Sequence, residues 1–377
     1  MRDTPPWHPS VPEWSPETLD VDPIERSETI PSSWYVDPAF HAWDRTAVFS
    51  THWQYAGHIG QLREAGDYLT ADAAGAPVVV VRGTDGALRA FYNVCRHRGG
   101  PLALDHCGRS AMLQCKYHGW TYRLDGSLRG VPRFNRVDLF DKKDYGLKPV
   151  RVATWEGLVF IHAGEPLLPL GDLLAGIAER IAPMRLEGLR FARRIRYEVA
   201  CNWKVYVDNY LEGYHLPYVH PELCDVLDVG RYETETFSYY SLQYSPLSPD
   251  STRYGAASDS AYYYFVFPNC MLNIMPGRLQ MNIVLPLAPD RCVVLFDYFY
   301  TDTDSLAAAR KIEEDMAFSD HVQQEDIEIC EWVQRGLASP AYDRGRFSVE
   351  CEQGVYHFQT QLKTAYRSAA RAAGNAL

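Results

Sequence analysis

Two short segments, each with one cysteine and one histidine, constrain this chain more than any other part of its sequence. The first holds Cys95 and His97, and the second, after a further 17 residues, holds Cys115 and His118. Two thiolates and two imidazoles suit either a zinc ion or a two-iron, two-sulfur cluster in which two histidines replace two cysteines on one iron. A zinc finger pairs cysteine with cysteine and histidine with histidine, whereas each segment here offers one of each. The pattern therefore favours the cluster, and zinc remains the alternative.

Glycines beside these residues permit the tight loops that an iron–sulfur cluster needs. Gly99 and Gly100 follow the first pair, and Gly119 follows the second. Glycine adopts backbone conformations that bring amide groups close to the cluster sulfurs. Cys107 lies between the two segments and is interpreted as a bystander.

The same segments resemble a known family. NVCRHRGGPLA and LQCKYHGWTYRLDGSL are similar to the cluster-binding loops of the Rieske non-heme iron oxygenases, in particular of their terminal oxygenase (alpha) subunits. Respiratory Rieske proteins carry one more cysteine in each loop for a disulfide bond, and neither loop has one here. The resemblance extends over about residues 30 to 365, and it implies a 2Fe-2S cluster held by Cys95, His97, Cys115 and His118.

The chain is long enough for a second domain, because it has 377 residues and domains hold roughly 100 to 200 residues each. Short strand-like stretches separated by glycine and proline predict a small antiparallel β domain over 44–163, which the resemblance identifies as the Rieske domain. Residues 1–43 and 164–377 are expected to form a larger catalytic domain with an antiparallel sheet flanked by helices, of helix-grip type. The predicted fold class is therefore α+β.

Local patterns predict the individual elements. Runs of β-branched and aromatic residues bounded by turn residues predict strands, and apolar periodicity with proline stops predicts helices. Residues 1–30, rich in proline and acidic residues, are expected to form an irregular arm that lies on a domain or on another subunit. The predicted strands are 77–82, 88–94, 120–123, 158–162, 193–199, 262–267, 279–284 and 293–300, and the predicted helices are 171–179, 203–215 and 305–336, the last capped by Asp304.

A second group of candidate metal ligands lies in residues 202–220. Asn209, Glu212 and His215 recur every three residues and would share one face of the predicted helix 203–215. His220 follows five residues after His215, a rotation of about 140° on a helix. Both histidines therefore reach one metal only if the helix stops between them, and prolines 217 and 221 supply that stop.

A non-heme Fe(II) site of the 2-His-1-carboxylate kind needs an acid from elsewhere. The long predicted helix offers Glu325, Asp326, Glu328 and Glu331, and composition leaves all four open. The family resemblance chooses among them. NWKVYVDNYLEGYHLPYVH is similar to the iron-binding helix of the family, and QQEDIEICEWVQRGL to its late acidic helix, which implies that His215, His220 and Asp326 hold the iron.

The resemblance also implies a function. Electrons from NAD(P)H would pass through a reductase or ferredoxin to the cluster and then to the mononuclear iron, where O2 is activated. The family is trimeric, and an acid at the position of Glu212 joins a cluster-binding histidine of one subunit to an iron-binding histidine of the next. Most relatives have aspartate there. We therefore expect a homotrimer with Glu212 and Asn209 as catalytic residues.

The expected substrate is a small quaternary ammonium compound. IPSSWYVDPAF and FPNCMLNI are similar to the choline, betaine and carnitine branch of the family, which implies hydroxylation or oxidative N-demethylation. Arg278 would suit a carboxylate, so a betaine is expected before choline. The alternatives are a mono- or dioxygenase acting on an aromatic acid and a non-catalytic electron carrier. Aromatic residues for a cation-binding cage, or alternatively for sheet packing, are Tyr239, Tyr240, Tyr244, Tyr262 to Tyr264 and Phe265.

Composition excludes other partners. The formal net charge is -11, whereas proteins that bind nucleic acid need a basic surface. The chain has no run of about 18 apolar residues that would cross a membrane. Its first residues, MRDTPPWHPSVPEW, are unlike the apolar core of a signal peptide. The nine cysteines are an odd number, which argues against a framework of disulfide bonds. A cytoplasmic protein is expected.

Overall fold

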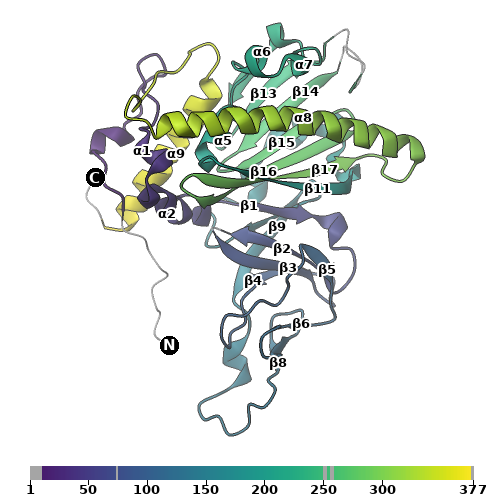
Figure 1. Cartoon of the computed structure of the whole chain (residues 1–377). Helices are drawn as coiled ribbons and strands as arrows, with labels where there is room; N and C mark the ends of the chain where they lie inside the picture. Colours follow the sequence, from purple (N-terminus) through teal and green to yellow (C-terminus); the bar gives the residue numbers. More distant parts are fainter. Residues whose placement is uncertain (1–10, 74, 249–252, 255–258, 375–377) are drawn as a thin grey trace. The chain divides into compact units, whose positions relative to one another are not determined.

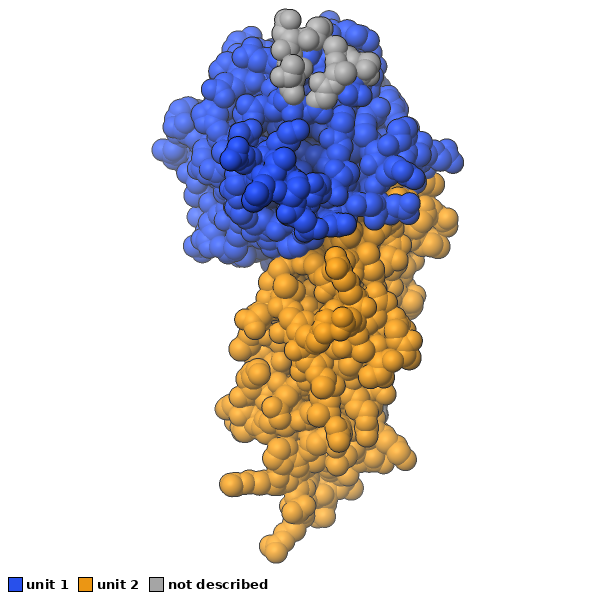
Figure 2. All heavy atoms as spheres, turned by 90° about the vertical axis from the view of Figure 1, so that its right-hand side faces the viewer, with its two compact units in different colours: residues 1–48, 176–377 blue, residues 49–175 orange. Residues whose placement is uncertain are grey.

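A computed structural model describes residues 11–73, 75–248, 253–254 and 259–374. The chain divides into two compact units, which Figure 2 shows in different colours. Residues 49–175 form one unit, and residues 1–48 and 176–377 form the other. Both units contain antiparallel sheets, and helices belong mainly to the second, so the predicted α+β class is confirmed (Figure 1).

The unit of residues 49–175 is built on a seven-stranded antiparallel sheet and a small three-stranded one. The hairpin β3–β4 is its clearest element, because four consecutive valines of β3 are fully buried and the chain turns at Gly86, where φ is +78°. In spatial order the large sheet is β1 (Gln54–His58), β10 (Leu158–His162), β9 (Pro149–Trp155), β4 (Leu88–Tyr92), β3 (Ala76–Arg82), β2 (Asp67–Ala73) and β5 (Cys107–Arg109), and the small one is β6 (Leu113–Gln114), β7 (Thr121–Tyr122) and β8 (Leu128–Gly130).

The other unit contains a second seven-stranded antiparallel sheet. Its strands are rich in aromatic and β-branched residues, which favour a pleated, buried surface. Strands β12 to β17 follow one another as a meander, and β11 pairs with the last of them. The spatial order is β11 (Arg190–Val199), β17 (Arg291–Tyr300), β16 (Arg278–Ala288), β15 (Cys270–Met275), β14 (Ser260–Val266), β13 (Tyr240–Pro246) and β12 (Glu233–Thr236).

Helices cover this second sheet, and the long helix α8 runs across its strands (Figure 1). The α-helices are α1 (Ser33–Val36), α2 (Pro38–Ala47), α3 (Leu170–Leu173), α4 (Ile177–Ile181), α5 (Trp203–Tyr210), α6 (Leu216–Val219), α7 (Pro221–Cys224), α8 (Leu306–Leu337) and α9 (Gln353–Ala372). Short 3-10 helices are Pro16–Leu19, Phe49–Thr51, Ile59–Gln61, Lys142–Tyr145, Ala182–Met184, Leu186–Gly188 and Val229–Arg231. Within the described ranges, no helix combines the length and the apolar character that a membrane crossing requires.

Three expectations about helices were wrong. The predicted helix 171–179 is two short helices, α3 and α4, because Gly176 adopts φ +88° and interrupts them. The predicted helix 203–215 ends at Tyr210. The cap of α8 is Ser305, whose hydroxyl accepts a hydrogen bond from Ala308 N, and not Asp304.

The N-terminal arm contacts α9 in its own unit. Asp20 O accepts a hydrogen bond of 2.9 Å from Lys363 Nζ, and Asp22 O accepts one of 2.7 Å from the Tyr356 hydroxyl. This holds for residues 11–30, since the first ten residues of the predicted arm lie outside the described residues.

A buried ion pair holds α5 against α2 and α9. Asp44 and Lys204 are both fully buried and form a salt bridge. Trp203 Nε1 donates to Asp44 at 2.7 Å, and the Tyr366 hydroxyl donates to the same carboxylate. Because α5 carries Asn209 and leads into the two candidate histidines, this cluster of Asp44, Trp203, Lys204 and Tyr366 fixes the helix from which the second candidate site is built.

Candidate metal centres

The two loops that carry the cysteine–histidine pairs have the same backbone pattern. In the first, Cys95 N donates to Gly100 O at 2.8 Å and Gly99 N donates to Cys95 O at 3.0 Å. In the second, Cys115 N donates to Trp120 O and Gly119 N donates to Cys115 O, again at 2.8 and 3.0 Å. Gly99 and Gly119 both adopt φ values near +70°, which glycine tolerates best. The loops are therefore two copies of one tight turn.

The four side chains of these loops form a set with a buried and an outer end. Cys95 and Cys115 are 2% and 3% exposed, whereas His118 is exposed and its ring centroid lies 4.8 Å from that of His97. A Cβ atom on Gly100 would come within 2.9 Å of Cys115 Sγ, so glycine keeps this space open. The arrangement fits a two-iron cluster with thiolates inside and imidazoles outside.

Hydrogen bonding and charge also fit metal binding at this set. The Tyr122 hydroxyl lies 3.3 Å from Cys95 Sγ, within reach of a thiolate. His97 Nδ1 is buried and has no hydrogen-bond partner among the residues that the structure describes. Burial, His118 and Arg98 lower the pKa of His97, which favours the neutral imidazole that a metal requires.

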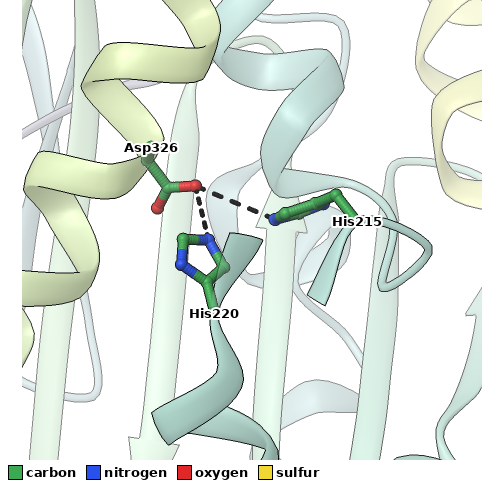
Figure 3. Close-up of side chains that lie close together, drawn as sticks. All are labelled: His215, His220 and Asp326. Atoms are coloured by element: carbon green, nitrogen blue, oxygen red, sulfur yellow. Dashed lines mark hydrogen bonds and ion pairs between the residues drawn. The ribbon is translucent and has the colours of Figure 1, made fainter. Parts of the chain in front are cut away.

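In the other unit, His215, His220 and Asp326 lie together (Figure 3). One ligand atom from each lies within 4.8 Å of the others. His220 Nε2 is 2.9 Å and His215 Nε2 is 3.8 Å from Asp326 Oδ1. In the described part of the chain, this is the one group of three or more such side chains with spacing that suits a single metal ion. The set has the composition of a 2-His-1-carboxylate iron site.

The local chain course differs from the predicted one. Because α5 ends at Tyr210, Asn209 lies on it but Glu212 and His215 do not, so the expected common helix face is wrong. A single turn of helix, α6, separates His215 from His220. Pro217 is the second residue of this turn and does not end a helix, which agrees with the tolerance of the first helical turn for proline.

Two further carboxylates orient the histidines. Glu212 Oε1 lies 2.7 Å from His215 Nδ1, and Glu325 Oε2 lies 2.7 Å from His220 Nδ1. Each contact leaves Nε2 of the ring directed to the common centre, as the outer partners of metal-binding histidines do. Glu325 was one of the four acids that the sequence left open, and its orienting position was not foreseen. Glu328 is exposed, and Glu331 accepts a hydrogen bond from Ala200 N.

Asn209 orients the carboxylate of Asp326, because its Nδ2 donates a hydrogen bond of 2.7 Å to Asp326 Oδ1. Glu212 also accepts hydrogen bonds from the backbone amides of Tyr214 and His215, the latter at 3.1 Å. Burial lowers the pKa of His220, but the two carboxylates of Asp326 and Glu325 outweigh it, so the pKa is raised. The centre is therefore electronegative, as a cation site requires.

A cavity of about 830 Å³, including open solvent at its mouth, ends at these side chains. Of the predicted aromatic cage, only Tyr263 lines it. Tyr262 and Tyr264 point to the other face of β14, where they contact Tyr244 and Tyr240. Sheet packing, the alternative to a cation-binding cage, therefore accounts for Tyr240, Tyr244, Tyr262 and Tyr264, because side chains alternate between the two faces of a strand. The aromatic residues that line the cavity and were not predicted are Tyr206, Tyr210, Tyr232, Tyr254, Phe296 and Phe318.

Arg278 also lines the cavity but already binds a carboxylate of its own chain. Its Nε donates to Asp315 Oδ2 at 2.6 Å, and a second nitrogen donates to Gln280 Oε1 at 2.5 Å. Asp315 further accepts hydrogen bonds from the hydroxyls of Tyr254 and Tyr300. Asp315 is 37 residues distant in the sequence, and no local pattern indicated the pair.

Comparison with known families gives two matches. Residues 52–142 match the Rieske [2Fe-2S] domain, and residues 186–368 match the catalytic domain of the ring hydroxylating alpha subunit.

Individual relatives agree with these matches. The chain is 38% identical to chloroplastic choline monooxygenase of Arabidopsis thaliana, over 90% of this chain and 83% of that protein. It is 31% identical to the carnitine monooxygenase oxygenase subunit of Escherichia coli (strain K12), over 93% and 97%. A solved quaternary ammonium Rieske monooxygenase superposes with a TM-score of 0.84 at 29% identity, covering 92% and 99% of the two chains. Naphthalene 1,2-dioxygenase, at 19% identity and a TM-score of 0.75, shares the fold.

Proposed function

The chain belongs to the ring-hydroxylating oxygenase alpha subunits that carry a Rieske [2Fe-2S] domain, and from this premise we propose that it oxidises a small quaternary ammonium compound. Membership makes it an oxidoreductase that uses O2, with a 2Fe-2S cluster and a mononuclear iron as cofactors and a separate electron donor. The expected alternative of a mere electron carrier is excluded, because the chain includes the catalytic domain.

The aromatic cavity that ends at the candidate iron ligands carries the proposal. Tyr206 and Tyr210 from α5, Tyr232, and Tyr263 from β14 line it together with the three candidate iron ligands. Aromatic faces attract a quaternary ammonium group by roughly 0.5 to 2 kcal/mol per contact. The chain is also similar to enzymes named for choline and for carnitine. A cationic head group would thus be held close to the metal.

The residues of the chain divide the remaining work. We assign the iron to His215, His220 and Asp326, and the cluster to Cys95, His97, Cys115 and His118. When bound, the cluster supplies single electrons and the iron supplies O2 activation. Glu212 and Glu325 hold the Nδ1 protons of the two histidines, and Asn209 holds one oxygen of Asp326. The ring-lined walls of the cavity limit the access of water to the reacting carbon.

A betaine is proposed before choline as the substrate. Arg278 is 5% exposed and lines the cavity, and its Nη1 lies 3.8 Å from the sulfur of Met275, a weak acceptor. A guanidinium has five donors, so it retains capacity for a substrate carboxylate beside Asp315. Because Asp315 offsets the charge of Arg278, the preference for a betaine rests on hydrogen bonds from the guanidinium to the substrate carboxylate.

Assembly and location complete the proposal. We propose a homotrimer in which Glu212 joins His215 of one subunit to the cluster of the next, and an NAD(P)H-dependent reductase or ferredoxin as the electron donor. Glu212 already binds His215 within the chain, which is half of such a bridge. A cytoplasmic location is supported by the nine cysteines, all of which are free of disulfide bonds.

The test is a comparison of substrates with one electron donor. Purified protein with a reductase would be given L-carnitine, glycine betaine, choline and benzoate, and O2-dependent product formation would be measured for each. The proposal expects coupled oxidation of at least one ammonium compound and none of benzoate. Product from benzoate alone would contradict it and would favour a mono- or dioxygenase acting on aromatic acids.

A further inference from the structure

One buried amide in the metal cavity has a donor group that no described residue uses. Gln323 lies on α8, one turn before Asp326, and is 1% exposed. Its Oε1 accepts a hydrogen bond of 2.6 Å from the Tyr206 hydroxyl, whereas its Nε2 has no partner in the described part of the chain. Buried N–H groups are almost always paired, because an unpaired one is destabilising. A ligand that accepts a hydrogen bond would satisfy it.

Three other amides of the cavity donate hydrogen bonds to described residues through their N–H groups. Asn209 donates to Asp326, Gln243 donates to Tyr210 O at 2.6 Å, and Gln280 donates to Asn282 Oδ1 at 2.9 Å. The contact with Tyr206 holds the oxygen of Gln323 and leaves the nitrogen as the unpaired end of the amide. Gln323 differs from these three amides because its oxygen is held by Tyr206 while its N–H group is buried and unpaired among the described residues.

The position of Gln323 along α8 indicates which part of a ligand it would meet. Ser319, Gln323 and Asp326 line the cavity, and Asp315 binds Arg278, which also lines it. The four residues follow one another at spacings of three or four, so they share one face of the helix. Gln323 is about 4.5 Å from Asp326 along the helix axis, whereas Asp315 is about 16 Å away. The free amide thus lies near the reacting end of the cavity, and the Arg278–Asp315 pair lies at the remote end.

We propose that Gln323 is a specificity-determining residue whose Nε2 donates a hydrogen bond to an oxygen on the carbon chain of the substrate, close to the ammonium group. The inference rests on the proposed function. Choline and L-carnitine carry a hydroxyl on the second carbon from nitrogen, and γ-butyrobetaine is L-carnitine without it. A buried donor selects for the hydroxyl compound, because the analogue without it leaves the N–H group unpaired.

The test measures binding instead of turnover. Dissociation constants of L-carnitine and γ-butyrobetaine would be determined by anaerobic calorimetry for the iron-loaded protein and for Gln323→Leu. The native protein is expected to bind L-carnitine about tenfold more tightly or better. Gln323→Leu is expected to bring the ratio near one by weakening L-carnitine alone. Gln323→Glu keeps an acceptor for Tyr206 but loses the donor, and would act in the same direction if the leucine variant fails to fold.

The neighbouring residue provides a matched control. Gln324 is exposed, so Gln324→Leu should leave the ratio unchanged, and the iron content of each variant reports whether Asp326 still binds. Equal affinities in the native protein, or a ratio that Gln323→Leu leaves unchanged, would mean that the amide binds only water and would overturn the inference while the proposed function stands. If neither compound binds, the inference fails, whereas the proposed function fails only if none of the ammonium compounds in the substrate comparison is oxidised.

Discussion

At the scale of single residues, the candidate iron site depends on partners that fix ring orientation and charge. Three carboxylates and an amide surround the two histidines. Glu212 and Glu325 contact the Nδ1 atoms of the two rings, and Asn209 contacts the carboxylate of Asp326. Asp326 Oδ1 lies within hydrogen-bond distance of Asn209 Nδ2 and His220 Nε2, and these contacts hold the carboxylate in place before any metal binds. Preformed side chains of this kind bind a metal with little rearrangement.

Asp326→Ala is expected to remove the mononuclear iron and turnover, because it takes away one of three ligands. The visible absorption of the cluster should remain, since its candidate ligands lie in the other unit. Iron analysis and an absorption spectrum check this. Glu328→Ala is the control, because Glu328 is exposed on the same helix. Loss of iron in the control and retention in Asp326→Ala would show that the wrong carboxylate was chosen.

A second residue-scale prediction concerns Asp208. Burial raises the pKa of this carboxyl to about 7, although hydrogen bonds from Tyr35 and Gln359 favour the charged form. Since the unfolded chain releases this proton near pH 4, the folded state alone binds it between roughly pH 4 and 7. The contribution of Asp208 to stability is therefore present at low pH and is lost as the pH rises through that window.

In the native protein, the titration of Asp208 is expected to lower the free energy of unfolding as the pH rises from roughly 4 to 7, by up to about 1.4 kcal/mol per pH unit. Asp208→Asn should remove this contribution to the slope. Urea denaturation of both proteins at pH 5, 6 and 7 measures the slope. Asp290→Asn, in an exposed turn, should have the slope of the native protein. Identical slopes in the native protein and in Asp208→Asn would show that Asp208 stays ionised when folded.

At the scale of elements, the sequence predicted strands better than helix ends and cavity walls. The hairpin 77–94 and the strands at 158–162 and 293–300 follow local residue preferences, and the structure confirms them. The candidate metal ligands also lie in short, recognisable segments. The end of α5 at Tyr210, the pair of Arg278 with Asp315 and the position of Tyr206 depend on contacts between distant parts of the chain, so no local pattern contains them.

The ion pair that holds α5 leads to a prediction about this element. Lys204→Met leaves Asp44 buried without its cation, and the loss of one partner of a buried pair costs about 3 to 5 kcal/mol. Urea denaturation should show this loss. Arg196→Met removes the cation of an exposed pair with Glu198 and should change stability little. A similar small effect of Lys204→Met would mean that the pair does not hold the helix.

At the scale of the whole molecule, one chain contains both a candidate electron-receiving centre and a candidate oxygen-using centre. They belong to separate compact units (Figure 2). The proposed trimer would let the cluster of one subunit serve the iron of the next, with Glu212 between them. Its contact with His215 gives this acid a defined place at the iron end.

Glu212→Gln is expected to keep both metal centres but to slow cluster oxidation in a single turnover of the prereduced enzyme, by roughly 10- to 100-fold. An amide cannot accept hydrogen bonds from two imidazoles as a carboxylate does. Stopped-flow absorption of the cluster measures the rate. Glu222→Gln, an exposed neighbour, should have the native rate. An unchanged rate in Glu212→Gln would remove it from the electron path.

The most direct test of the account is the content of iron and acid-labile sulfide per purified chain. Two separate ligand sets, one of two thiols and two imidazoles and one of two imidazoles and a carboxylate, predict about three irons and two sulfides. Plasma emission spectrometry and a sulfide assay measure both on one sample. Zinc at the four-ligand set without sulfide, or two irons with no third even after anaerobic loading with Fe(II), would contradict the claim that this chain holds two cooperating metal centres.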